Sequence, residues 1–324
     1  MNWLSNFIRP KINQFGNQAK DVPENLWEKC PACDGMLFHR ELKAAQNVCY
    51  HCGHHLRIDV EDRLHNLFDD GDYKRIPVPK VPTDPLKFKD KKRYSDRLSD
   101  AQKKRNRKDA IIVAEGAIDG QNAIVAAFDF KFMGGSMGAG VGEGIVTAAE
   151  KAVKKGLPLI VIPSSGGARM QEAAISLMQM PRTIVAVEMV KEAGLPYIVL
   201  LTDPTTGGVS ASFAMLGDIQ MAEPGATIGF AGKRVIQETI REELPDGFQT
   251  AEYLLEHGMV DMVVARKDQP ETIGRVIDLL MNKKGGGKGG KKSKEYNSDE
   301  KIATSVPLPD VARGGNQTRL KKAA

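Results

Sequence analysis

The sequence predicts an α/β fold, and two observations support this prediction. First, short apolar segments are each followed by a glycine turn and then by a stretch rich in small residues, as expected for buried strands that lead into helices. Second, a unit of strand, Gly-Gly and helix occurs twice, about 41 residues apart, at Gly166-Gly167 and at Gly207-Gly208. With 324 residues, 41% of them hydrophobic, the chain can bury a large core.

The elements of this fold can be assigned in order from residue 110 onward. The expected strands are 111–114, 124–128, 159–162, 197–201, 226–230 and 262–265. The first two are expected to pair around the turn Asp119-Gly120. The expected helices are 145–155, 170–180, 181–193 and 209–216. The boundary at Pro181 is predicted because proline cannot donate the hydrogen bond that continues a helix.

The four cysteines, Cys30, Cys33, Cys49 and Cys52, form two C-x2-C pairs. Two residues between thiolates allow a tight turn to direct both sulfurs at one ion, and two such turns supply four ligands for Zn²⁺. Four protein ligands leave no open coordination position, so we expect one structural zinc ion. His51, His54 and His55 are then surface residues or residues that contact the ligands.

Two short segments carry the positive charge, while the net charge of the whole chain is +5. Residues 87–108 have a net charge of +8 and residues 283–324 a net charge of +7, so the rest of the chain is acidic. The 87–108 segment fits a solvated helical face or a phosphate-binding patch. The tail is low in complexity and poor in apolar residues, which predicts disorder and leaves a polyanion-binding arm as the alternative.

The residue inventory argues against a side-chain nucleophile. His257 is the only histidine after residue 65, and no cysteine follows Cys52, so a Ser-His-Asp or Cys-His arrangement is not expected. Glu143, Glu172 and Asp203 are general-base candidates by position, or carboxylates at helix ends and turns. The glycine-rich 134–144 stretch matches no nucleotide-binding motif.

The two Gly-Gly pairs suggest a different kind of chemistry. Without side chains the backbone can approach a ligand closely, and consecutive N–H groups can stabilise a phosphate or an enolate oxygen. The alternative is a tight turn that allows close helix packing.

No apolar run approaches the roughly 18 residues of a membrane span. Residues 1–15 also lack a signal-peptide core, so a cytoplasmic protein with no membrane association is expected.

Several longer motifs resemble one known family. The segments that carry the resemblance are the two cysteine pairs, Phe132-Met-Gly-Gly-Ser-Met-Gly138, Ser165-Gly-Gly-Ala-Arg-Met-Gln-Glu172, Leu201-Thr-Asp-Pro-Thr-Thr-Gly-Gly208, Ala222-Glu-Pro-Gly-Ala-Thr-Ile-Gly-Phe-Ala-Gly232 and Leu244-Pro-Asp-Gly-Phe248. In this order they resemble the beta subunits of bacterial acetyl-coenzyme A carboxylase carboxyltransferase. The resemblance extends from Trp3 to about Met281.

The resemblance implies a crotonase-like ββα-superhelix with an N-terminal zinc ribbon. The implied parts are an N-terminal helix or linker (1–29), the ribbon (30–52), a connecting basic segment (53–109), the carboxyltransferase domain (110–282) and a disordered basic tail (283–324). The implied reaction moves carboxylate from carboxybiotin, held by the biotin carboxyl carrier protein, to acetyl-CoA and gives malonyl-CoA. The implied partners are also biotin carboxylase and the carboxyltransferase alpha subunit, in an α2β2 assembly.

The resemblance also assigns residues to roles. The amides of Gly207 and Gly208 match one oxyanion hole of the family. The residues expected near acyl-CoA are Gly134, Gly135, Ser136, Met137, Ser165, Gly166, Gly167, Ala168 and Arg169. In the family mechanism the biotin ureido nitrogen takes the α-proton of acetyl-CoA, which agrees with a body that holds a single histidine.

Three other interpretations remain open from the sequence. A crotonase-type CoA hydratase or decarboxylase uses the same oxyanion chemistry, but it does not require the ribbon. A zinc-ribbon nucleic-acid-binding protein would use the ribbon and both basic segments, and nucleic-acid binding can coexist with catalysis. A non-catalytic structural subunit would share the fold without the activity.

Overall fold

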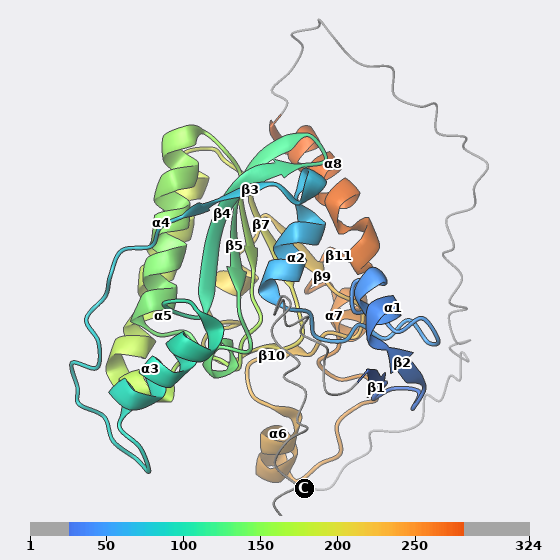
Figure 1. The fold of residues 1–324 in the computed structure, drawn as a ribbon, viewed down its shortest axis with the longest axis horizontal. Helices are drawn as coiled ribbons and strands as arrows, with labels where there is room; N and C mark the ends of the chain where they lie inside the picture. The colour runs from blue at the N-terminus through green and yellow to red at the C-terminus, as the bar shows by residue number, and fades with distance from the viewer. Residues whose placement is uncertain (1–25, 282–324) are drawn as a thin grey trace, which may run out of the picture. The chain divides into compact units, whose positions relative to one another are not determined.

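A mixed seven-stranded sheet lies at the centre of the fold (Figure 1). The structure is a computed structural model, and it describes residues 26–281. The strand order of the sheet is β11-β9-β7-β6-β5-β4-β3. The strands are β3 (Tyr73–Ile76), β4 (Ile111–Ile118), β5 (Gln121–Phe128), β6 (Leu159–Ile162), β7 (Tyr197–Leu201), β9 (Ile219–Ala222) and β11 (Met262–Val263). Strands β3, β4 and β5 are antiparallel, whereas β5, β6, β7, β9 and β11 run parallel. The parallel strands therefore end at a common edge.

The predicted hairpin and the predicted central strands are confirmed. Strands β4 and β5 pair with Ile118 opposite Gln121, which leaves Asp119-Gly120 as the turn. Strands β6 and β7 match the predicted segments 159–162 and 197–201. The strands predicted over 226–230 and 262–265 are each only two residues long, as β10 (Ile228–Gly229) and β11. Strand β10 pairs in parallel with β8 (Thr205–Thr206) outside the large sheet.

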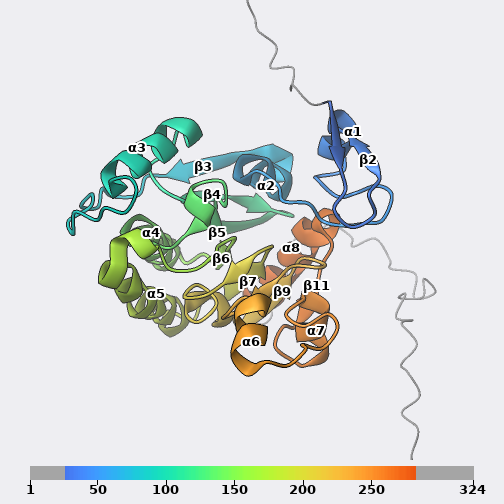
Figure 2. The ribbon, with the colours of Figure 1, turned by 90° about the horizontal axis from the view of Figure 1, so that it is seen from below.

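Each face of the sheet is covered by helices, which gives two hydrophobic cores (Figures 1 and 2). Helices α4 (Ala139–Lys155) and α5 (Ala173–Glu192) cover one face, and α2 (Val60–Leu67) and α8 (Gln269–Met281) cover the other. Ile124 of β5 belongs to the α4–α5 core, while the next residue, Val125, belongs to the α2–α8 core. This alternation follows from the pleat of a strand, and it explains why β5 to β7 are apolar throughout.

Three of the four predicted helices are present with different bounds. The helices predicted on either side of Pro181 form the single helix α5, which follows a 3-10 turn, η4 (Met170–Glu172). Pro181 lies on the exposed side of α5, where water can reach the carbonyl that loses its partner. Helix α4 begins six residues before the predicted start, because Gly140, Gly142 and Gly144 fit closely against other side chains. An added Cβ would lie 2.1 to 2.6 Å from Asp109, Gln179 or Ile111.

The helix predicted over 209–216 is wrong. The segment forms turns and one 3-10 helix, η5 (Phe213–Met215). The hydroxyl of Ser210 donates to the main-chain oxygens of Gly207 and Gly229, and the hydroxyl of Ser212 donates to that of Gly208. These bonds compete with the hydrogen-bond pattern of a helix, which is the usual effect of serine in this position.

A small N-terminal unit and three further helices complete the described residues. The N-terminal unit contains the hairpin of β1 (Trp27–Lys29) and β2 (Met36–Phe38), followed by α1 (His39–Ala44). The further helices are α3 (Tyr94–Arg105), α6 (Lys233–Ile240) and α7 (Ala251–Glu256). The predicted disordered tail (283–324) and most of the predicted N-terminal helix or linker (1–29) lie outside the described residues.

One helix of the described residues is long and apolar enough to cross a membrane by length and composition alone, although charged residues interrupt its apolar sequence. It spans Met170–Glu192 with a mean hydropathy of 1.2, and 33% of its most apolar window is buried. It corresponds to η4 and α5, which pack on α4 and beside β7. A single helix of this kind is weak support for a membrane span, because core helices of globular proteins pass the same test.

Candidate metal centre and candidate active site

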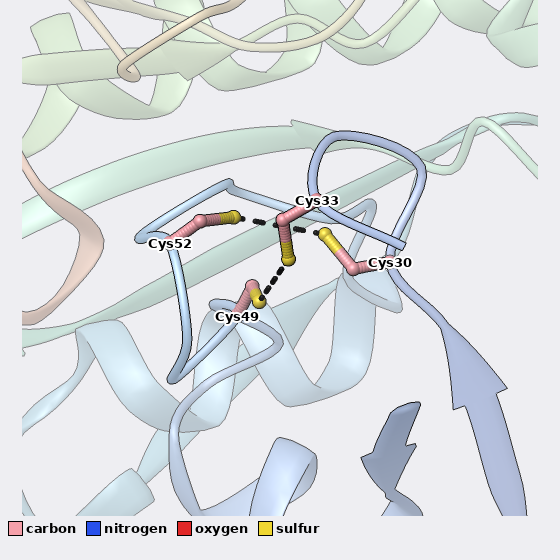
Figure 3. A group of neighbouring side chains, drawn as sticks. All are labelled: Cys30, Cys33, Cys49 and Cys52. Atoms are coloured by element: carbon pink, nitrogen blue, oxygen red, sulfur yellow. Dashed lines mark hydrogen bonds between the residues drawn. The ribbon is translucent and has the colours of Figure 1, made fainter. Parts of the chain in front are cut away.

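The four cysteine side chains of the N-terminal unit point toward one another (Figure 3). All four Sγ atoms are within 4.8 Å of one another, and the Cys30–Cys52 and Cys33–Cys49 pairs are each 3.8 Å apart. A tetrahedral ion with metal–sulfur bonds of about 2.3 Å requires sulfurs about 3.8 Å apart. The sulfurs are too far apart for disulfides, and the donor set fits one four-coordinate metal ion.

The turns around the cysteines direct the sulfurs inward. The amide of Asp34 donates to the oxygen of Cys30, and the amide of Gly53 donates to the oxygen of Cys49, so each C-x2-C pair closes a turn. His51 contacts the main-chain oxygen of Met36 through Nε2 and is not one of the clustered donors. The core of this unit contains only Cys30, Leu37, Leu42, Cys49 and Leu56. A core this small usually needs a metal or a disulfide to be stable.

A buried arginine joins the N-terminal unit to the body. Arg266 donates through Nη1 to the main-chain oxygen of Gln46 at 2.6 Å, and through Nε and Nη2 to both carboxylate oxygens of Glu223. Arg63 donates to the same carboxylate. Burial opposes ionisation of Glu223, but the two guanidinium groups hold its pKa well below the usual value. The carboxylate therefore stays charged at the end of β9.

Three turns stack at the carboxyl ends of the parallel strands, and they contain all the residues predicted for the oxyanion hole and for acyl-CoA. Each turn follows one strand: 133–138 follows β5, 164–169 follows β6 and 203–208 follows β7. The amide of Gly166 donates to the oxygen of Gly134, and that of Met137 donates to the oxygen of Gly167. The amide of Thr206 donates to the oxygen of Ser165. Main-chain hydrogen bonds therefore set the positions of the three turns relative to one another.

Some main-chain amides of these turns donate a hydrogen bond within the chain, and others have no acceptor; the latter are called open amides below. Gly207 donates to the oxygens of Gly229 and Phe230, at 3.2 and 2.9 Å. The amides of Gly166 and Gly167 are also engaged. Among residues 26–281, the amides of Ala168 and Gly208 have no hydrogen-bond acceptor. A Cβ placed on Gly208 would lie 3.6 Å from the nitrogen of Ala168, so the two open amides lie on adjoining backbone segments.

Close backbone contacts require glycine at two of these turns. Gly135 has φ +62°, and an added Cβ would lie 1.9 Å from the main-chain oxygen of Ser164. Gly207 has φ +63°, and an added Cβ would lie 3.1 Å from the Cα of Gly167. Both positions combine a left-handed backbone with neighbouring main chain, which only glycine tolerates without rearrangement.

The guanidinium of Arg169 is fully buried and supports the 133–138 turn through hydrogen bonds. It donates to both carboxylate oxygens of Asp109, to the main-chain and side-chain oxygens of Ser136, and to Tyr94 and Glu172. Although burial opposes the charge, Asp109 raises the pKa of Arg169. Because all of its donors are engaged inside the chain, the side chain fixes the 133–138 turn against the 164–169 turn.

The general-base candidates are all engaged as well. Glu172 accepts from the hydroxyl of Tyr94 at 2.5 Å and from the amide of Ala139 at 2.6 Å, at the start of α4. Glu143 pairs with Arg182, and Asp203 pairs with Arg57 at 3.1 Å. His257 lies on α7, where Nδ1 contacts the main-chain oxygen of Tyr253. The site therefore presents open main-chain amides and no unpaired carboxylate from these three candidates.

Comparison with known proteins identifies the family. The carboxyl transferase domain model matches residues 86–309. The acetyl-coenzyme A carboxylase carboxyl transferase subunit beta of Granulibacter bethesdensis is 63% identical over 280 residues, which cover 86% of this chain and 91% of that protein. The subunit beta of Rhizobium meliloti is 57% identical over 283 residues, which cover 87% and 93%. The chain belongs to this carboxyl transferase family.

Solved structures agree with the fold of this carboxyl transferase beta chain. The crystal structure of transcarboxylase 12S with methylmalonyl-coenzyme A and methylmalonic acid bound matches with a TM-score of 0.56 at 24% identity. The match covers 74% of this chain but only 42% of the transcarboxylase chain. The predicted crotonase-like α/β fold is confirmed, and membership of the family makes the protein a transferase.

The basic segment of this beta chain is not a free cationic face. Of its eleven basic residues, four form ion pairs within the chain: Lys92, Arg97, Arg105 and Arg107. Arg105 donates to Asp59 and Asp129, which ties the C-terminal end of α3 to the start of α2 and the end of β5. Part of the +8 charge therefore has a structural use.

Sequence reasoning missed several residues that organise the site. Tyr94 and Asp109 complete the Arg169 cluster, and Glu223 and Arg266 connect the metal unit to the body. Tyr94, Asp109 and Arg266 belong to none of the motifs quoted above, and Glu223 lies in the 222–232 segment, whose pattern does not indicate an ion pair. A prediction of their roles would require knowing which segments lie close together in the fold, and these segments are between 43 and 220 residues apart in the sequence.

Proposed function

We propose that this chain is the zinc-binding beta subunit of an acetyl-CoA carboxylase carboxyltransferase. It transfers carboxylate from carboxybiotin, held by the biotin carboxyl carrier protein, to acetyl-CoA and forms malonyl-CoA. Biotin carboxylase supplies the carboxybiotin, and an alpha subunit completes an α2β2 assembly. The observation that carries the catalytic part is the pair of open amides, Ala168 and Gly208, on adjoining turns.

The open amides provide the group that this reaction needs most. Cleavage of the N–C bond of carboxybiotin releases CO2 and leaves the electron pair on the ureido nitrogen. This nitrogen then takes a proton from the methyl carbon of acetyl-CoA, so negative charge develops on the thioester oxygen. The same carbon then forms its new bond to the released CO2. Two N–H groups directed at that oxygen stabilise the enolate, and each such donor can contribute about 10²–10³ in rate. The oxyanion role predicted for Gly207 and Gly208 is thus assigned to Gly208 together with Ala168, since the Gly207 amide already has two acceptors.

The remaining predicted residues hold the acyl-CoA side of the site through their main chain. Residues 134–137 and 165–168 belong to turns that main-chain hydrogen bonds join beside the open amides. The guanidinium of Arg169 has no donor left for a CoA phosphate, so we assign it to support of the 133–138 turn. The paired states of Glu143, Glu172 and Asp203 favour a mechanism in which the substrate, and not a protein carboxylate, accepts the proton.

An exposed apolar surface on α5 is an argument for a partner subunit that binds there. Its members are Met170, Leu177, Met178, Ile184, Val185 and Met189 of η4 and α5, with exposed fractions between 37% and 67%. A contiguous apolar stripe beside an active site usually marks a protein interface. Met180 of the same helix lies against Gly208, so a subunit bound to α5 would lie close to the open amides.

One Zn²⁺ bound by Cys30, Cys33, Cys49 and Cys52 stabilises the N-terminal unit. The sulfur–sulfur distances suit a tetrahedral ion, and cysteine thiolates favour zinc among common cellular metals. With four ligands the ion has no position for substrate, so its role is structural.

The test is a reconstituted assay that contains the beta chain, its alpha subunit, biotinylated carrier protein, biotin carboxylase, ATP, bicarbonate and acetyl-CoA. Formation of malonyl-CoA that depends on both subunits and on biotin supports the proposal. Hydration of an enoyl-CoA or decarboxylation without biotin would support a crotonase-type hydratase or decarboxylase instead. Absence of turnover, together with nucleic-acid binding that weakens steeply with salt, would support the nucleic-acid-binding alternative.

A further inference from the structure

Arg57, which lies between the metal unit and α2, contacts the strand ends that carry the candidate active site. Arg57 follows the unit and precedes α2, and its main-chain oxygen accepts a hydrogen bond from Nδ2 of Asn47 at 3.1 Å. The oxygen of Asn47 accepts in turn from the amide of Leu56 and from Nη1 of Arg266. The backbone of Arg57 is therefore attached to the metal unit, independently of its side chain.

The side chain of Arg57 contacts the 203–208 turn and the segment between β5 and the 133–138 turn. Its Nε donates to Oδ2 of Asp203 at 3.1 Å, and its guanidinium carbon lies 4.2 Å from the centre of the Phe130 ring. Phe130 comes two residues after β5, and Asp203 comes two residues after β7. A cation over an aromatic ring and an ion pair are both attractive, so a single guanidinium restrains two strand ends.

Asp203 extends this restraint to the turn with the open amide of Gly208. Its Oδ1 accepts from the amide of Thr227, and its main-chain oxygen accepts from the hydroxyl of Ser164, both at 3.2 Å. The oxygen of the next residue, Pro204, accepts from the amide of Ser165 at 2.6 Å. The partner of Arg57 thus lies where the turns after β6 and β7 are joined.

We propose that Arg57 is a positioning residue for carboxyl transfer, which keeps the 203–208 turn aligned with the open amide of Ala168. This inference rests on the proposed function. The guanidinium itself touches neither open amide, and the side chains of Arg57 and Asp203 are 52% and 34% exposed. An ion pair with this exposure adds little to global stability. Its loss should therefore appear in kcat rather than in the thermal midpoint or in the KM for acetyl-CoA.

The kinetic test compares R57A with R75A in the assembled enzyme. Arg75 is a matched control, because it pairs with Glu61 at 2.6 Å with side-chain exposures of 58% and 33%, on β3 and away from the stacked turns. We expect R57A to lower kcat about tenfold with little change in KM, since small misalignment of reacting groups is costly. R75A should match the wild type, and R57K should recover part of the loss. Equal kcat values for R57A and R75A would overturn the proposal.

Two further measurements separate positioning from other effects. The D203N variant removes the charge but keeps an oxygen for Thr227, so the R57A/D203N double variant should lose no more activity than R57A alone; additive losses would contradict the proposal. Amide hydrogen exchange on the wild type, R57A and R75A needs no turnover. Faster exchange at 205–207 in R57A alone supports the restraint, and unchanged exchange overturns it. A wild-type enzyme without malonyl-CoA formation would refute the proposed function, while the exchange result still decides the role of Arg57.

Discussion

A Cβ atom placed on Gly207 would lie 3.1 Å from the Cα of Gly167, so these two glycines bring neighbouring turns into direct backbone contact. The two belong to the Gly-Gly pairs that recur along the sequence. The Gly207-Gly208 pair serves both purposes considered for such pairs. Gly207 allows close packing of the two turns, and the amide of Gly208 stays free of any acceptor and can bind an oxyanion.

The G207A variant should lose at least about 10²-fold in kcat, because the added methyl displaces the turn that carries the Gly208 amide. G120A is the matched control. Gly120 has φ +77°, similar to the +63° of Gly207, but an added Cβ there has no neighbour within 4 Å. Both substitutions carry the backbone cost of alanine in a left-handed conformation, about 1–2 kcal/mol. Steady-state kinetics and thermal unfolding of both variants check the prediction. Comparable kcat values would contradict it.

Removal of the Ala168 amide hydrogen should reduce transfer without removing any side-chain contact of the substrate. A168P lacks the N–H group, whereas A168G keeps it. One oxyanion donor contributes about 10²–10³ in kcat, so A168P should fall by that factor while A168G stays within a few fold of the wild type. Single-turnover measurements on both variants, with circular dichroism as the check of folding, decide the matter. Activity retained in a folded A168P enzyme would refute the role of this amide.

The stability of the protein should depend on Glu223 in the acidic range. Its pKa in the folded state is well below the ordinary value of 4.5, because Arg63 and Arg266 outweigh the effect of burial. A lowered carboxylate pKa stabilises the folded state above the unfolded value, and this contribution is lost as the pH falls through the folded pKa. E223Q should cost about 3–5 kcal/mol at about pH 7, since it leaves two guanidinium groups unpaired.

Urea unfolding from about pH 7 to about pH 3 tests this dependence. The difference in unfolding free energy between wild type and E223Q should narrow below about pH 4.5, because Glu223 then binds a proton in the unfolded chain while it stays charged in the folded protein. D100N is the control, because Asp100 forms an exposed ion pair with Lys92 and its loss should change the stability little at any pH in this range. A gap between wild type and E223Q that stays constant over the whole range would disprove the linkage.

The C30S variant should lose its metal and the fold of the N-terminal unit. Cys30 and Cys49 make up two of the five residues in the core of that unit, so loss of the metal removes both ligation and packing. The control is Y50F, which removes the hydroxyl contacts with Phe38 and Met36 but no sulfur. Elemental analysis and limited proteolysis provide the measurements. Full metal content in C30S with normal protease resistance would contradict the assignment.

The sequence was sufficient where the local pattern and the tertiary environment agree. Strands β6 and β7 are short, fully apolar and flanked by glycine or proline, so their limits could be predicted to the residue. The metal cluster was equally predictable, because two C-x2-C pairs have few other uses in a chain of this kind.

The predictions failed where tertiary contacts outweigh the local pattern. Pro181 does not break α5, since it lies on the exposed side of a helix that packs on α4. Residues 209–216 look helical by composition, but the hydroxyls of Ser210 and Ser212 bond to nearby main-chain oxygens. The predicted acyl-CoA residues do gather at one edge, yet only the fold shows that the Arg169 side chain lies behind them, bonded to Asp109.

The hydrogen bonds between the stacked turns have a consequence for protein engineering. Both open amides belong to the main chain, and their direction is set by backbone contacts such as those between Gly134 and Gly166 and between Ser165 and Thr206. Side chains that line the site can therefore be exchanged to admit a bulkier acyl group without redirecting these N–H groups, provided that Arg57 and Arg169, which hold the turns, are kept. Directed evolution of substrate range should accumulate substitutions in the lining side chains and leave the glycines of the three turns untouched.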